Sequence, residues 1–289
     1  MKKVDFFIVG APKAGTTSLY HYLNEHSDIE MCSQKEPDFF SDSYLHTQML
    51  YYGKNRIDSI EKYHALFQQD NIMMRGDASV SYLFYEEVPQ KIIKYNPNAK
   101  IVIMLRNPID RAFSHYLMDY RLGLVSEKFE SIILKKSKHK YADLFYQQYI
   151  QVSEYAMQIK NYLNIFSKDN ICIIDYEDFK KNTSEVVNRV YVFLGVDNSF
   201  QPHLTNKYNI YSMPKNLIIR YIYSFVFLRK IITRILPKNL GAIIRQLLFN
   251  NKNKPQLSSE TKNILKKHFE NDVQTLSILL NKDFKKWIR

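Results

Sequence analysis

The fold is decided by residues 6–19, which read FFIVGAPKAGTTSL. An apolar run enters a turn that contains Gly10 and Gly15, and a hydroxyl-rich segment follows, as at the start of a helix. The two glycines have the spacing of a P-loop, in which backbone N–H groups and a helix N-terminus converge on an anion. The stretch therefore predicts a β-strand, a loop that binds phosphate or sulfate, and a helix.

The loop departs from the form found in ATP-binding proteins at one position. Thr16 stands directly after the second glycine, where those proteins have a lysine, and the lysine of this loop is Lys13. The loop therefore suits a phosphorylated ligand but not ordinary magnesium–nucleotide chemistry. A structural alternative is a simple strand–turn–helix unit in which Thr16, Thr17 or Ser18 only caps the helix.

A second motif begins with the apolar run at residues 101–105, which ends at Arg106 and leads into a predicted helix. Asn107 suits the cap of that helix and Pro108 suits its first position. Ser114 lies off the predicted buried stripe of the helix, whose members are Ile109, Phe113, Tyr116, Leu117 and Tyr120. An arginine at a strand end and a serine on the following helix can face one crevice and hold a second phosphate.

Together, the two motifs resemble those of sulfotransferases that use 3′-phosphoadenosine 5′-phosphosulfate (PAPS), and the resemblance covers nearly the whole chain. It implies an α/β fold with a P-loop-like parallel sheet flanked by helices, in a single domain at residues 1–289. It implies that Arg106 and Ser114 bind the 3′-phosphate of the donor. The 5′-phosphosulfate would be bound by Pro12, Lys13, Ala14, Gly15, Thr16, Thr17 and Ser18.

Residues 34–40, QKEPDFF, resemble the acidic motif of bacterial carbohydrate sulfotransferases and heparan sulfate enzymes. Sulfuryl transfer to an alcohol needs a base for the hydroxyl proton and a cation for the charge on the leaving phosphate. The resemblance implies that Glu36 is the base and that Lys13 stabilises the leaving oxygen, with no metal. Glu36 could instead be a solvated loop carboxylate. Lys35 either helps to bind an anionic acceptor or is surface charge.

Two positions differ from the heparan-type pattern. Asp38 stands where those enzymes commonly have a histidine, and Ala78 stands where they have a lysine. Both positions are on the acceptor side in that family, so we expect a different acceptor with the same donor. Asp77 and Ser79 either hydrogen-bond a sugar hydroxyl or cap a turn. The expected acceptor is a hydroxyl, or as a second choice an amine, of a carbohydrate or glycolipid.

The composition agrees with this reading. The formal net charge of the 289 residues is +12, which implies an anionic partner such as the nucleotide donor, an acidic saccharide, a membrane surface or nucleic acid. The basic residues are dispersed and no nucleic-acid motif accompanies them, so we expect no nucleic-acid partner. Cys32 and Cys172 suggest neither a disulfide framework nor a metal site. The short apolar start before the loop does not fit a signal peptide, and we expect a cytoplasmic, bacterial enzyme.

The rest of the chain alternates between helical and strand patterns. We expect a helix at residues 152–166, a strand at 171–174 and a helix that ends at Gly195. Residues 206–255 are irregular, and the family places a loop that covers the donor there. Within them, 217–249 is apolar but carries basic residues, which favours a helix on a membrane surface, in an acceptor groove or in the core over a membrane-spanning one. Residues 257–289 predict a C-terminal helix packed onto the sheet.

Two other functions remain open on the sequence. A P-loop phosphotransferase would need a metal-binding acid at a strand end. Arg106 occupies the best such position, and Asp77 follows only a short apolar run. A nucleotide-binding protein without catalysis is the other alternative, against which the presence of Glu36 and Lys13 argues.

Overall fold

The computed structural model describes residues 2–48, 50, 56–69, 71–204, 213–215, 219, 221, 248–250 and 255–289. Most of the predicted covering region at 206–255, and of the apolar segment at 217–249, lies outside the described residues. No helix within the described ranges is long and apolar enough to cross a membrane.

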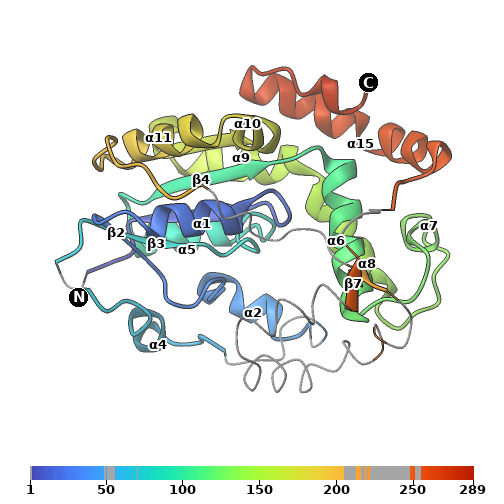
Figure 1. Cartoon of the computed structure of the whole chain (residues 1–289), viewed down its shortest axis with the longest axis horizontal. Coiled ribbons are helices and arrows are strands. Elements are labelled where there is room, and N and C mark those ends of the chain that lie inside the picture. Colours follow the sequence, from blue (N-terminus) through green and yellow to red (C-terminus); the bar gives the residue numbers. More distant parts are fainter. Residues whose placement is uncertain are drawn as a thin grey trace.

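A five-stranded parallel sheet forms the centre of the molecule (Figure 1), in the order β2–β3–β1–β4–β5. Its strands are β1 (Phe6–Gly10), β2 (Ile29–Met31), β3 (Met74–Asp77), β4 (Lys100–Leu105) and β5 (Ile171–Asp175). Every residue of the central strand β1 is buried, as expected for a parallel strand covered on both faces. The predicted parallel α/β sheet is therefore confirmed, and β1 delivers the glycine-containing loop to the middle of its carboxyl edge.

Helices cover both faces of the sheet. The helices around it include α1 (Thr16–Asn24), α5 (Val88–Tyr95), α6 (Pro108–Leu122), α9 (Tyr155–Ile165), α10 (Tyr176–Lys181), α11 (Thr183–Leu194) and α15 (Ser259–Leu280). The connections from β1 to β2 and from β3 to β4 run in opposite directions across the sheet. Because such connections are right-handed, α1 and α5 lie on opposite faces. Accordingly, α11 contacts α1, and α9 contacts α5.

Short elements complete the described chain. They are η1 (Phe39–Ser41), α2 (Asp42–Leu45), α4 (Ile60–His64), α7 (Phe129–Ile133), α8 (Ala142–Tyr149), η2 (Gln151–Ser153), η3 (Lys168–Asn170) and η4 (Lys285–Trp287). Strands β6 (Met213–Pro214) and β7 (Phe249–Asn250) form a separate antiparallel pair. The predicted C-terminal helix is α15, red in Figure 1, which contacts α9 and α6 and so packs onto helices rather than mainly onto the sheet.

Aromatic side chains hold β1 in place within the sheet. The ring of Phe7 on β1 contacts those of Phe40, Tyr82 and Tyr95. On β3, a Cβ at Gly76 would lie 2.2 Å from the Phe6 ring, so only glycine lets β1 and β3 approach at this point. Burying each phenylalanine contributes about 2–3 kcal/mol. The strand that carries the loop is therefore firmly anchored.

Candidate functional site

The loop between β1 and α1 requires its second glycine. Gly15 has φ 93° and is the N-cap of α1, and a Cβ there would lie 3.1 Å from the ring of Tyr176. No side chain makes a capping hydrogen bond at this helix start. The N-cap is thus Gly15, and none of Thr16, Thr17 and Ser18 occupies the cap position. The first N–H groups of α1 keep the geometry that favours an anion.

Lys13 projects from the loop into surroundings that contain both basic and acidic side chains. Its backbone is left-handed, with φ 69°, and its Nζ lies 3.5 Å from the Sδ of Met118 on α6. Burial, together with the charges of Arg121 and Arg106, lowers the pKa of Lys13 to about 8, against the opposing effect of Asp119 and Glu36. An anionic ligand would offset this cost by stabilising the charged amine.

Arg106 is tied directly to the loop. Its Nη1 donates a hydrogen bond of 2.9 Å to the carbonyl of Lys13, and its guanidinium lies over the ring of Tyr176, 4.8 Å from the centroid. Its own carbonyl accepts a hydrogen bond of 3.0 Å from the hydroxyl of Tyr155. The Nε of Arg106 is buried and has no hydrogen-bond partner in the described part of the chain. A buried donor of this kind is costly unless a ligand supplies the acceptor, so the site fits an anionic group.

The helix that follows Arg106 begins as the sequence predicts. Asn107 caps α6 by accepting a hydrogen bond from the amide of Ile109, and Pro108 is the first helical residue. Ser114 lies half-buried on this helix. Arg106 and Ser114 thus come from one rigid β4–α6 unit.

The buried face of α6 differs from the predicted stripe, of which Ile109 and Leu117 are buried and the three aromatic members are only partly buried. Arg111, His115 and Asp119 are also buried, four residues apart along the helix. The guanidinium of Arg111 is satisfied by the hydroxyl of Ser153 and by the carbonyls of Gln148 and Tyr149. These polar residues hold α6 against α8 and η2, and they keep its later turns beside Lys13.

Glu36 lies in a turn at the carboxyl edge of β3. Its amide donates a hydrogen bond of 3.1 Å to the carbonyl of Ala78, which directly follows that strand. Its side chain is 43% exposed and forms an ion pair with the ammonium group of Lys35. Since Glu36 also contributes to the field at Lys13, the structure brings the predicted base and the predicted loop cation to the same edge of the sheet.

Asp77 and Ser79 are not available for direct contact with a sugar. Both side chains are 0% exposed. The carboxylate of Asp77 accepts hydrogen bonds from the hydroxyls of Ser79, Tyr63 and Tyr82, at 2.7, 2.7 and 2.9 Å. Burial raises the pKa of Asp77 to about 6, against the opposing effect of these three hydroxyls. The prediction that they contact the acceptor is therefore wrong, and the two residues form a buried polar cluster.

The C-terminal segment contributes contacts that the sequence analysis did not anticipate. Asn107 donates a hydrogen bond of 3.0 Å to the carbonyl of Trp287, and Lys286 donates one of 2.9 Å to the carboxylate of Asp175 at the end of β5. The ring of Trp287 also contacts that of Tyr155. The residues around Arg106 are thus braced by the last residues of the chain. The sequence around Asn107 identifies it as a helix cap, but it does not indicate a hydrogen bond to a carbonyl 180 residues away.

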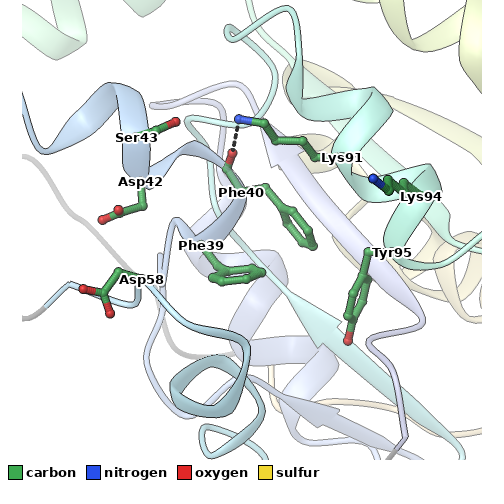
Figure 2. A pocket seen from close by; sticks show the side chains of 8 residues that line it. All are labelled: Phe39, Phe40, Asp42, Ser43, Asp58, Lys91, Lys94 and Tyr95. Carbon is green, nitrogen blue, oxygen red and sulfur yellow. Dashed lines mark hydrogen bonds between the residues drawn. The ribbon is translucent and has the colours of Figure 1, made fainter.

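A cavity of about 540 Å³ opens beside the segment that follows Glu36. In Figure 2 the ring of Phe40 lies between those of Phe39 and Tyr95, with centroid separations of 5.0 and 5.4 Å. Lys91 reaches the carbonyl of Phe40 at 3.5 Å, and Lys94 also lines the cavity. Asp42 and Asp58 line it as well, so the cavity combines apolar ring surface with side chains of both charges.

The central strand, the glycine loop and the arginine at the neighbouring strand end define an α/β protein with a P-loop-like arrangement at the carboxyl edge of its sheet. A family model described as a sulfotransferase domain matches residues 3–277. The chain therefore belongs to the sulfotransferase domain family.

Individual relatives agree with this membership. A solved structure of a sulfotransferase from Alicyclobacillus acidocaldarius is similar over 100% of both chains, with a TM-score of 0.73 and 27% identity. Human carbohydrate sulfotransferase 15 is 25% identical over 66% of this chain and 43% of its own length. The bifunctional heparan sulfate N-deacetylase/N-sulfotransferase 1 of Xenopus tropicalis is 25% identical over 68% of this chain. This chain spans 23% of that second curated relative, so each of the two is considerably longer than the region it shares.

Proposed function

We propose that the protein transfers a sulfuryl group from PAPS to a hydroxyl of a carbohydrate or glycolipid. The observation that carries the proposal is the direct hydrogen bond from Arg106 to the backbone of Lys13, because it joins the predicted 3′-phosphate ligand to the predicted phosphosulfate loop. The unpartnered Nε of Arg106 supports an anion at this position. The names of the carbohydrate and heparan sulfate relatives support a glycan acceptor.

Each residue has a separate task in this proposal. The loop residues 12–18 bind the 5′ end of the donor, and Arg106 with Ser114 binds its 3′-phosphate and so sets its register. Bound in this way, the donor supplies the sulfuryl group that is transferred. Lys13 holds positive charge at the leaving oxygen, where negative charge develops. Glu36 accepts the proton of the acceptor hydroxyl, which makes the oxygen a better nucleophile.

The alternative of a metal-dependent phosphotransferase has less support. Asp77 ends β3, beside the loop strand, and its oxygens accept three hydroxyl hydrogen bonds in a fully buried setting. Asp175 ends β5, and its carboxylate accepts a hydrogen bond from Lys286. The alternative of an inactive nucleotide-binding protein differs from the proposal only in that it predicts no sulfuryl transfer, so a measurement of turnover decides between the two.

The proposal is tested by transfer of ³⁵S from labelled PAPS to a panel of desulfated glycosaminoglycans and glycolipids. Label should appear in at least one acceptor. Glu36→Gln should lower kcat on the order of 10²- to 10⁴-fold, with little change in affinity for the desulfated product, 3′-phosphoadenosine 5′-phosphate (PAP). Glu86→Gln, which changes an exposed carboxylate, is the control and should keep full activity. Near-normal turnover of Glu36→Gln would show that Glu36 is not the base.

A further inference from the structure

The turn that carries Glu36 has an unusual backbone. Glu36 and Asp38 have φ values of 60° and 56°, so two residues other than glycine adopt the left-handed conformation around Pro37. Side chains with a Cβ disfavour this conformation, and it persists only where surrounding contacts impose it. The direction of the Glu36 carboxylate therefore depends on what holds the turn.

One contact to the turn comes from a buried serine. The amide of Asp38 donates a hydrogen bond of 3.0 Å to the Oγ of Ser79. The hydroxyl proton of Ser79 is directed to the carboxylate of Asp77, 2.7 Å away. Because the proton has this partner, a lone pair of the Ser79 oxygen is left facing the Asp38 amide. The hydroxyls of Tyr63 and Tyr82 both donate to the other carboxylate oxygen of Asp77. These bonds fix the orientation of the carboxylate, and with it the direction of the Ser79 hydroxyl.

A second contact reaches the side chain of the same turn. The hydroxyl of Ser81 donates a hydrogen bond of 2.6 Å to the carboxylate of Asp38 and lies 2.8 Å from the hydroxyl of Ser41. The turn is therefore held at its backbone by Ser79 and at its side chain by Ser81. Both serines follow β3, the strand whose carboxyl edge lies beside the glycine loop.

We propose that Ser79, backed by the carboxylate of Asp77, is a positioning residue that fixes the Glu36–Pro37–Asp38 turn and thereby aims Glu36 at the acceptor hydroxyl. This inference rests on the proposed function, since it assigns Ser79 a role through the proposed base. It explains why two polar side chains are buried directly behind the catalytic edge without reaching it.

The test compares four variants in the ³⁵S transfer assay, using the best glycosaminoglycan acceptor of the panel. Ser79→Ala should lower kcat about 10- to 100-fold, because a small misplacement of a catalytic group has an effect of this size. Its affinity for PAP, measured by calorimetry, should change by less than about twofold, since neither Ser79 nor the turn is among the proposed donor ligands. Ser79→Thr keeps the hydroxyl and should recover most of the loss. Ser81→Ala removes the less buried contact and should lower kcat in the same direction.

Asn96→Ala is the control for general loss of stability. Asn96 is also buried, and its side chain bonds to the carbonyl of Val4 and the amide of Asn98, near the amino edge of β1 and away from the turn. It should lower the melting temperature but leave kcat unchanged. Equal losses of kcat in Ser79→Ala and Asn96→Ala would overturn the positioning role.

A double-mutant cycle separates this inference from the proposed function. In the Glu36→Gln background, Ser79→Ala should have almost no further effect on kcat, because it acts through the carboxylate already removed. If Ser79→Ala costs the same factor with and without Glu36, the positioning role fails while the base assignment stands. If Glu36→Gln turns over normally, Glu36 is not the base. Ser79→Ala then has no reason to affect kcat differently in the two backgrounds, and the positioning role is overturned as well. Hydrogen exchange at the Asp38 amide gives a readout without turnover: it should speed up in Ser79→Ala and remain slow in Asn96→Ala.

Discussion

The amine of Lys13 should make donor binding depend on pH in a range where few groups titrate. Burial, together with the nearby guanidinium groups of Arg121 and Arg106, lowers the pKa of Lys13 from 10.5 to about 8 in the free protein. Above that pH the amine is increasingly neutral and attracts an anion less. Affinity for PAP should therefore fall as the pH rises, which is the opposite of the behaviour expected if a carboxylate had to ionise.

The size of the effect follows from the pKa. With a pKa of about 8, roughly nine-tenths of Lys13 is charged at pH 7 and about one-tenth at pH 9, so the association constant of PAP should fall about tenfold. The phosphates of PAP, whose second pKa is about 6, stay ionised over this range. At pH 8 binding should take up about half a proton, because the bound anion draws the amine back to its charged form.

The assay is isothermal titration of PAP at pH 7, 8 and 9 and constant ionic strength, in pairs of buffers with different ionisation enthalpies. Lys13→Arg is the matched control, since arginine keeps its charge throughout. Its affinity should be flat with pH, and its binding should take up no proton. An equal pH dependence in Lys13→Arg, or a flat profile in the unaltered protein, would show that the Lys13 amine does not set the pH dependence of PAP binding.

Two further changes probe the neighbouring strand end. Arg106→Ala should weaken PAP binding by about 10- to 100-fold, the effect of losing a charged hydrogen-bond donor. An unchanged PAP affinity would remove Arg106 from the donor site. Asn107→Ala should lower stability by about 1–2 kcal/mol, or roughly 3–6 °C in melting temperature, because it removes the cap of α6 and the contact with the Trp287 carbonyl. Asn182→Ala is the control, because Asn182 is the N-cap of α11 but its side chain makes no capping hydrogen bond. It should lower the melting temperature less than Asn107→Ala does. Equal shifts in melting temperature would argue against the brace formed by the C-terminal segment.

The parts of the site that are contiguous in sequence could be predicted. A P-loop is formed by one strand, one turn and one helix start, so residues 6–19 contain all of its determinants. The same is true of Arg106, Asn107 and Pro108 at the β4–α6 junction, where the predicted cap and first helical residue are confirmed. In both places local chemistry and backbone geometry are decided within a few residues.

The contacts that orient these parts could not be predicted in the same way. Asp77 and Ser79 can equally bind a ligand or form a buried cluster, and the choice depends on Tyr63, which another segment brings to them. The polar face of α6 has a similar ambiguity. Arg111 lies outside the predicted buried stripe, yet it is buried, and carbonyls of α8 satisfy its guanidinium in the interior. Only the packing of distant segments decides between such readings.

The proposed function requires that this edge of the sheet recognise a nucleotide with a 3′-phosphate and a 5′ anionic group. The most direct measurement is calorimetric titration of the unaltered protein with PAP, with adenosine 5′-phosphate and with ATP plus magnesium. We predict tight binding of PAP without added metal and at least about 100-fold weaker binding of adenosine 5′-phosphate, because the latter lacks the group that Arg106 and Ser114 are proposed to bind. Equal affinity for the two adenosine phosphates, or a preference for ATP with magnesium, would contradict the account.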